Sequence, residues 1–134
     1  MSPHGQLIMV VDDDEDVREI VELVLQAMGY RVVTAADGLE AWREICLGER
    51  PAMILLDLMM PRMDGEHFMR TLRSSPSGTI PVVIMSGHSS ARDQARALRA
   101  DHCLTKPIDL DELLTTVGRF TAQQPAHGSR PATP

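Results

Sequence analysis

The stretch that decides the fold is Met53-Ile54-Leu55-Leu56-Asp57-Leu58-Met59-Met60-Pro61. Its first four residues form an unbroken apolar run, which is short for a helix and typical of a strand buried on both faces. Asp57 follows, and Pro61 ends the strand because proline has no N–H to donate. Met63-Asp64-Gly65 then predicts a turn into a helix capped by Asp64. The stretch therefore places a carboxylate at the end of a buried strand, where ligands bind in open α/β sheets.

Strand-like and helix-like segments alternate along the rest of the chain. Apolar runs predict strands at residues 6–11, 31–34, 53–56, 81–85 and 102–105. Helical spacing predicts helices at about residues 17–28, 38–48, 64–73, 90–99 and 110–120. Five successive strand–helix pairs predict an α/β fold, with a doubly wound parallel sheet of five strands and helices on both faces.

Apolar stripes predict which side of each helix is buried. The fourth stripe is the thinnest, because two of its three members are alanines. In chain order, the stripes are Val17, Ile20, Val21, Val24 and Met28; Leu39, Trp42, Ile45 and Cys46; Phe68, Met69 and Leu72; Ala91, Ala95 and Leu98; and Leu110, Leu113, Leu114, Val117 and Phe120.

Composition limits the class of protein. With 134 residues, 43% of them hydrophobic, the chain is expected to form one globular domain at residues 6–120, with an extension at 1–5 and a flexible tail or linker start at 121–134. A net charge of −6 argues against a general nucleic-acid surface. The apolar runs are too short to cross a bilayer, and Met1–Gly5 does not resemble a signal peptide. Two cysteines do not make a disulfide framework, so a cytoplasmic location without membrane contact is expected.

Reactive side chains stand at four predicted strand ends. Asp12 and Asp13 end the first strand, Asp57 the third, Ser86 the fourth and Lys106, the only lysine, the fifth. Because parallel strands end at one edge, these groups are expected to cluster. Neighbouring carboxylates repel one another, and a divalent cation with oxygen ligands relieves that repulsion, so the cluster predicts a Mg²⁺ site.

An aspartate, a hydroxyl and a lysine around magnesium are suited to phosphoryl transfer. The metal neutralises phosphate oxygens, and the lysine and hydroxyl donors hold the others as charge moves. Asp57 would be the covalent acceptor.

Four motifs together resemble the receiver domains of two-component signalling, the family of the chemotaxis response regulator. The resemblance covers about residues 6–120 and implies a flavodoxin-like fold with strand order 2-1-3-4-5. The motifs are Val10-Val11-Asp12-Asp13-Asp14, Leu55-Leu56-Asp57-Leu58-Met59-Met60-Pro61 with Met63-Asp64-Gly65, Ile84-Met85-Ser86-Gly87, and Leu104-Thr105-Lys106-Pro107.

The resemblance also implies a role for each site residue. Asp57 would take a phosphoryl group from a phosphohistidine of a sensor histidine kinase or histidine phosphotransfer protein. Asp13, Asp57 and the Met59 backbone carbonyl would bind Mg²⁺ directly, and Asp12 through water. Ser86 and Lys106 would bind the phosphoryl group. The domain would be a signalling switch that promotes its own phosphoryl transfer and autodephosphorylation, as a monomer or weak homodimer, and would bind its downstream partner through the fourth and fifth helices.

Some residues depart from the family pattern. Cys103 stands where the family usually has Tyr or Phe, so the usual aromatic relay is missing; a small core residue is the favoured interpretation of Cys103 over a redox sensor. Ala100-Asp101 replaces the usual Gly-Ala. His102 is the nearest ring, interpreted as a strand-end residue. The Met59 and His88 side chains are candidates for tuning hydrolysis, although His88 also fits a solvated loop.

Other functions remain as alternatives. A Mg²⁺-dependent phosphatase using an aspartyl-phosphate needs a second acid just beyond the nucleophile, and Met59 occupies that position. An interaction module without phosphorylation-driven switching is favoured by Cys103 and disfavoured by the intact set of acids, Ser86 and Lys106. A nucleotide-binding domain is disfavoured because no Gly-rich phosphate loop follows the first strand.

Overall fold

A single parallel sheet of five strands forms the centre of the molecule. The computed structural model describes residues 5–60, 62–87 and 91–122. The strands are β1 (Leu7–Val11), β2 (Arg31–Ala35), β3 (Met53–Asp57), β4 (Val82–Ser86) and β5 (His102–Thr105). Their order in the sheet is β2-β1-β3-β4-β5, and every neighbouring pair is parallel. Both the predicted topology and the predicted strand order are confirmed.

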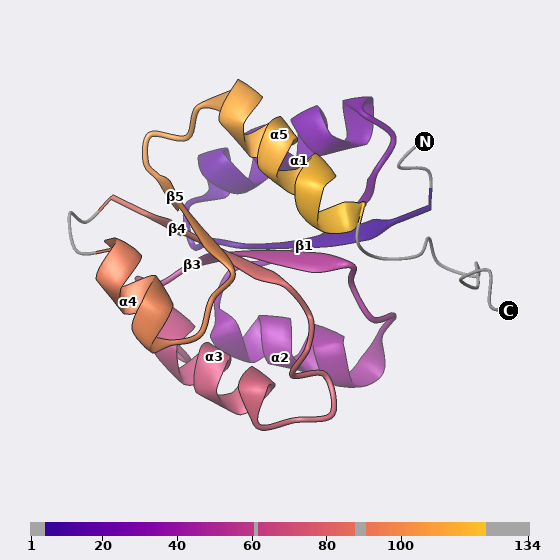
Figure 1. Cartoon of the computed structure of the whole chain (residues 1–134). Helices are drawn as coiled ribbons and strands as arrows, with labels where there is room; N and C mark the ends of the chain where they lie inside the picture. The colour runs from indigo at the N-terminus through magenta and orange to yellow at the C-terminus, as the bar shows by residue number, and fades with distance from the viewer. Residues whose placement is uncertain (1–4, 61, 88–90, 123–134) are drawn as a thin grey trace, which may run out of the picture.

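Five helices cover the sheet on both faces (Figure 1). They are α1 (Glu15–Ala27), α2 (Gly38–Leu47), α3 (Gly65–Arg73), α4 (Ala91–Ala97) and α5 (Leu110–Thr121). Helices α1 and α5 lie on one face, and α2, α3 and α4 lie on the other. Aspartates start four of the helices by accepting backbone N–H groups of the first turn, as capping requires; they are Asp14, Asp37, Asp64 and Asp109.

The core consists of two apolar layers, one on each face of the sheet. Side chains alternate between the faces along a strand. Met53 and Leu55 of β3 therefore pack with the α1 and α5 layer, whereas Ile54 and Leu56 pack with the other. All five residues of β3 are buried, which confirms the interpretation of this run as a strand covered on both sides.

Three predicted helix stripes need correction. In α1, Val21 and Leu25 are buried, whereas Ile20 and Met28 are each 51% exposed. Apolar residues occupy so much of the circumference of α1 that the spacing alone does not select the face that meets the sheet. In α2, Cys46 is exposed, and Gly38 and Ala41 are buried instead. In α5, Leu110 is 40% exposed because it is the first residue of the helix and precedes the turns that meet the sheet.

Segment boundaries differ from the prediction by small amounts. The structure starts β1 at Leu7 and extends β2 to Ala35 and β4 to Ser86, while α4 ends at Ala97. Within the described part of the chain, no helix combines the length and apolar character needed to cross a membrane.

Candidate functional site

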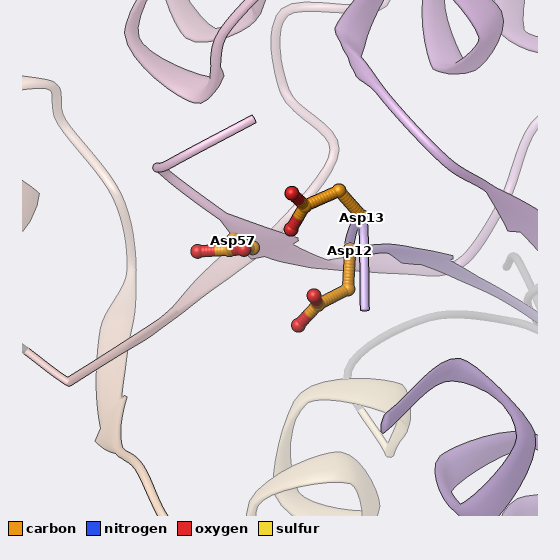
Figure 2. A group of neighbouring side chains, drawn as sticks. All are labelled: Asp12, Asp13 and Asp57. Atoms are coloured by element: carbon orange, nitrogen blue, oxygen red, sulfur yellow. The ribbon is translucent and has the colours of Figure 1, made fainter. Parts of the chain in front are cut away.

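The register of the sheet brings Asp12 and Asp57 together. Val11 lies opposite Leu56 in the β1–β3 pairing, so the next residues on these parallel strands are neighbours. Asp12 is fully buried and Asp57 is 5% exposed, whereas Asp13 is exposed to solvent. Figure 2 shows Asp12 and Asp13 side by side, with Asp57 next to them. Each carboxylate offers an oxygen within 4.8 Å of those of the other two, as predicted.

Asp12 is held in place by its own loop. Its Oδ1 accepts the Asp14 N–H at 2.9 Å, and its carbonyl accepts from Arg18 Nη1 at 2.7 Å. Oδ2 is buried and lies 2.8 Å from Lys106 Nζ, but within the described residues it makes no hydrogen bond of good geometry. This buried oxygen of Asp12 therefore has the Lys106 ammonium as its charged neighbour and can accept a further hydrogen bond, such as one from a metal-bound water. The contact between Arg18 and the Asp12 carbonyl was not predicted, because nothing in the sequence around Arg18 indicates where its side chain binds.

Asp57 has an unusual titration because it is buried beside other acids. The pKa of Asp57 is raised from 3.8 to about 6, and desolvation on burial is the largest cause. The charges of Asp12 and Asp13 act in the same direction, whereas the Met59 N–H, which donates to Asp57 Oδ1 at 3.1 Å, and the Lys106 ammonium act against it. A cation bound here would therefore favour the ionised carboxylate.

Lys106 faces both buried acids. Its Nζ lies 2.8 Å from Asp12 Oδ2 and 3.6 Å from Asp57 Oδ2. Burial by itself lowers the pKa of Lys106, but the interactions with Asp12 and Asp57 outweigh burial, so this pKa is raised. The side chain is therefore held as an ammonium that points at the cluster.

The cluster fits a hard divalent cation. Three carboxylates face one ammonium, and all the candidate ligand atoms are oxygens. Magnesium uses one or two carboxylates directly and keeps several waters. The exposed Asp13, the buried Asp57 and the incompletely satisfied Asp12 Oδ2 together suit such an ion.

The loop after Asp57 is fixed by close backbone packing. The Gly65 N–H donates to the Leu58 carbonyl at 3.1 Å, and a Cβ on Gly65 would lie 2.6 Å from Leu58 Cα. Only glycine allows this approach. The same loop is tied to α2, because the Gly38 N–H donates to the Met63 carbonyl at 2.8 Å and Arg62 pairs with the buried Asp37. Sequence reasoning identified Asp64 and Gly65 but missed the Arg62–Asp37 pair.

The remaining predicted residues that the structure describes lie on β4, on β5 and in the loop after β3. Ser86 is 1% exposed at the end of β4, and its carbonyl accepts the Lys106 N–H at 2.9 Å. The Met59 side chain is 62% exposed. Cys103 is half-buried and packs against the core, consistent with a small core residue. His102 lies near Phe120 of α5, with ring centroids 6.3 Å apart. His88 lies outside the described residues.

Comparison with known proteins gives a consistent result. The family model described as "Response regulator receiver domain" matches residues 8–118. The response regulator MprA of Mycobacterium ulcerans is 41% identical over 109 residues, which is 80% of this chain and 46% of that protein. The chain thus spans about half the length of the curated relatives it matches.

Solved structures agree with the same assignment. A putative response regulator from Chloroflexus aurantiacus superimposes with a TM-score of 0.83 at 32% identity, covering 88% of this chain and 98% of that one. The receiver domain of a sensor histidine kinase from Pseudomonas aeruginosa has a TM-score of 0.81 at 28% identity, with the same coverage. That second structure holds a magnesium ion in its active-site cleft.

Proposed function

We propose, since this chain belongs to the family of response regulator receiver domains, that it takes a phosphoryl group from a phosphohistidine onto Asp57 and thereby changes its binding to a partner protein. The observation that carries this proposal is the buried Asp57 carboxylate at a strand end, beside Asp12 and 3.6 Å from Lys106 Nζ.

The transfer replaces one phosphorus bond by another. An Asp57 oxygen attacks phosphorus and forms the acyl-phosphate bond, while the P–N bond breaks and its electron pair returns to the donor imidazole. Lys106 and the Ser86 hydroxyl would hold the phosphoryl oxygens. Asp13, Asp57 and the Met59 carbonyl would bind Mg²⁺, with Asp12 acting through water. The bound metal supplies positive charge next to the phosphoryl oxygens.

Signalling is favoured over turnover of an external substrate. We infer that the domain promotes its own phosphoryl transfer and autodephosphorylation, and that the side chains of Met59 and His88 tune hydrolysis. A phosphatase is disfavoured because Met59, at the place of the second acid, presents an exposed thioether that carries no proton for a leaving group. A module that binds partners without phosphorylation remains the alternative.

The proposed partners are a sensor histidine kinase or histidine phosphotransfer protein and a downstream protein bound at α4 and α5. We place the domain at about residues 6–120, as the sequence predicts, and extend it by one residue to the end of α5, because the Thr121 carbonyl accepts from Gln6 Nε2 at 2.8 Å and Thr121 is buried. The residues that follow are then a tail or linker, and the domain acts as a monomer or weak homodimer in the cytoplasm.

Acetyl phosphate tests the assignment of Asp57. Incubation of the protein with acetyl phosphate and Mg²⁺ should add one phosphoryl group by intact mass, and Asp57→Asn should abolish the addition. Asp64→Asn, an exposed helix cap outside the cluster, is the matched control and should retain the label. Full labelling of the Asp57→Asn protein would refute the assignment.

A further inference from the structure

A cavity of about 310 Å³ lies between α4 and β5, away from the acidic cluster. Its volume is at the lower limit of ligand pockets, which range from roughly 300 to 1,000 Å³, so it suits one large side chain better than a whole cofactor. The cavity lies beside Cys103, where a small side chain leaves space next to α4. Its lining residues are Arg92, Ala95, Arg96, Ala100, Asp101, His102 and Cys103.

The walls and the mouth of the cavity differ in chemistry. Ala95 and Ala100 offer methyl groups and Cys103 offers a polarizable sulfur. Arg92 and Arg96 stand four residues apart on α4, so they share one side of that helix, and both are exposed. Within residues 5–60, 62–87 and 91–122, neither of these guanidinium groups forms an ion pair.

The charge around the cavity is opposite to that of the whole chain. Residues 91–99 contain three arginines and one aspartate, although the net charge of the protein is −6. Asp101 does not cancel this excess, because its Oδ2 already accepts the Val82 N–H at 2.8 Å and pairs with Arg73 at 3.2 Å. A partner that fills this cavity is therefore expected to carry negative charge next to the part that enters it.

We propose that the cavity receives one aromatic side chain from an acidic segment of a partner protein. An aromatic ring fits methyl and sulfur walls, and arginine stacks on aromatic faces. Acidic residues flanking the ring in the partner would pair with Arg92 and Arg96 at the mouth. Aromatic anchors in pockets of this kind dominate many protein interfaces.

This inference rests on the proposed function only in assigning the partner to the signalling output of the domain. The cavity is present without phosphorylation, so peptide binding can be measured on the unmodified protein. Failure of peptide binding would leave phosphorylation of Asp57 untouched, and failure of phosphorylation would leave the cavity and its binding measurement unchanged.

A short model peptide tests the proposal. The probe is a capped pentapeptide with phenylalanine at its centre and two glutamates on each side, titrated into isotope-labelled protein and followed by NMR. We expect saturable shifts at millimolar peptide, centred on Ala95, Ala100 and Cys103. Alanine in place of phenylalanine should weaken binding about tenfold. Glutamine in place of the glutamates should weaken it several-fold, and the difference should shrink in high salt.

Filling the cavity is the decisive variant. Cys103→Phe should place a ring in the cavity and weaken peptide binding about tenfold or more. Cys46→Phe is the matched control, because Cys46 is exposed on α2, and it should bind as the parent does. If Cys103→Phe does not fold, Arg92→Gln with Arg96→Gln provides a second test and should weaken binding several-fold.

Three results would overturn the proposal. They are equal binding of the phenylalanine and alanine peptides, an unchanged affinity in a folded Cys103→Phe protein, and the absence of shifts at millimolar peptide. A single-stranded oligonucleotide added as a second probe distinguishes the remaining source of negative charge. If the oligonucleotide shifts the NMR signals of the same residues more strongly than the peptide does, Arg92 and Arg96 bind nucleic acid and the protein-partner proposal is wrong.

Discussion

The acidic cluster and the corner between α4 and β5 are built in different ways. The cluster stands on strand ends whose neighbours are completely buried, and the β1–β3 register fixes the separation of Asp12 and Asp57. The corner depends on α4, a helix of seven residues with Ala95 as a buried side chain and a cavity next to it. The sheet therefore holds the charges of the cluster at fixed separations. Helix α4 buries less surface, so it can move more easily when the cluster changes.

One arginine supplies several of the polar contacts between the corner and the rest of the molecule. Arg73 Nη1 donates to the carbonyls of Gly78 and Ile80, at 2.9 and 2.8 Å, and Nη2 donates to the Arg99 carbonyl at 3.0 Å. Arg99 has a left-handed backbone with φ of +63°, which is unfavourable for a residue with a Cβ. Polar contacts from Arg73 and Asp101 thus add to the small apolar surface that α4 buries, whereas completely buried strands support the cluster.

Adding a methyl group at Gly65 should have the largest effect and would break the rigid region. Its Cβ would meet Leu58 Cα at 2.6 Å and the Asp57 carbonyl at 2.7 Å, so backbone must move. We expect Gly65→Ala to lower the free energy of unfolding by about 3 kcal/mol. Gly118→Ala on α5 is the control, since a Cβ there meets nothing within 4 Å, and it should be neutral or slightly stabilising. Urea denaturation measures both, and equal stabilities would contradict the tight packing at Gly65.

The pH dependence of stability should reveal the charge repulsion in the cluster. Because the folded-state pKa of Asp57 is raised from 3.8 to about 6, the folded protein binds this proton more tightly than the unfolded chain does. The resulting stability is fully present below about pH 4 and is lost as the pH rises through about 6, by at most about 3 kcal/mol.

Two comparisons isolate that contribution. In a chelator, the loss between pH 4 and 7 should be smaller for Asp57→Asn than for the parent. Mg²⁺ should restore stability to the parent at pH 7, because it binds the native cluster and not the unfolded chain, and Asp13→Ala should remove most of that gain. Identical pH profiles for the parent and Asp57→Asn proteins would contradict a raised pKa at Asp57.

The sequence predicted the cluster better than the corner for a physical reason. Strand ends in a parallel sheet meet at one edge whatever the conformations of the loops, so the strand pattern alone was enough to bring Asp12, Asp13, Asp57 and Lys106 together. The contacts of Arg73 and Arg62 join loops that are distant in the chain, and no local pattern encodes such partners. The buried face of α1 was wrong at Ile20 and Met28 for a related reason, since a helix apolar on several sides does not reveal its orientation.

Removing the Lys106 ammonium should have a smaller effect, measured as a loss of affinity for a phosphoryl mimic. The result distinguishes a phosphate-binding lysine from one that only pairs with Asp12. Lys106→Ala should weaken binding of beryllofluoride, a phosphoryl mimic, by about tenfold to a hundredfold, because charge-assisted hydrogen bonds contribute roughly 1.5–3 kcal/mol. Lys106→Arg is the control that keeps the charge, and its planar fork should restore affinity only in part. Calorimetry in Mg²⁺ measures the affinities, and an unchanged value for the alanine variant would leave Lys106 as a structural ion-pair partner of Asp12.

The smallest expected effect is a change in hydrogen exchange at the corner. A helix that buries little apolar area opens at low free-energy cost, so activation should alter the segment from Ser86 to Arg99 most. With beryllofluoride and Mg²⁺, we expect exchange in α4 to change about fivefold, which corresponds to about 1 kcal/mol, while the buried amides of β1 and β3 stay unchanged.

Arg73→Gln should speed exchange around Arg99 and Asp101 even without the mimic, because it removes the contacts that hold this turn. Asp57→Asn should show no response to the mimic. Changes confined to the loops after β1 and β3 would mean that the corner does not respond, and would favour a domain that binds partners without a phosphorylation-driven rearrangement.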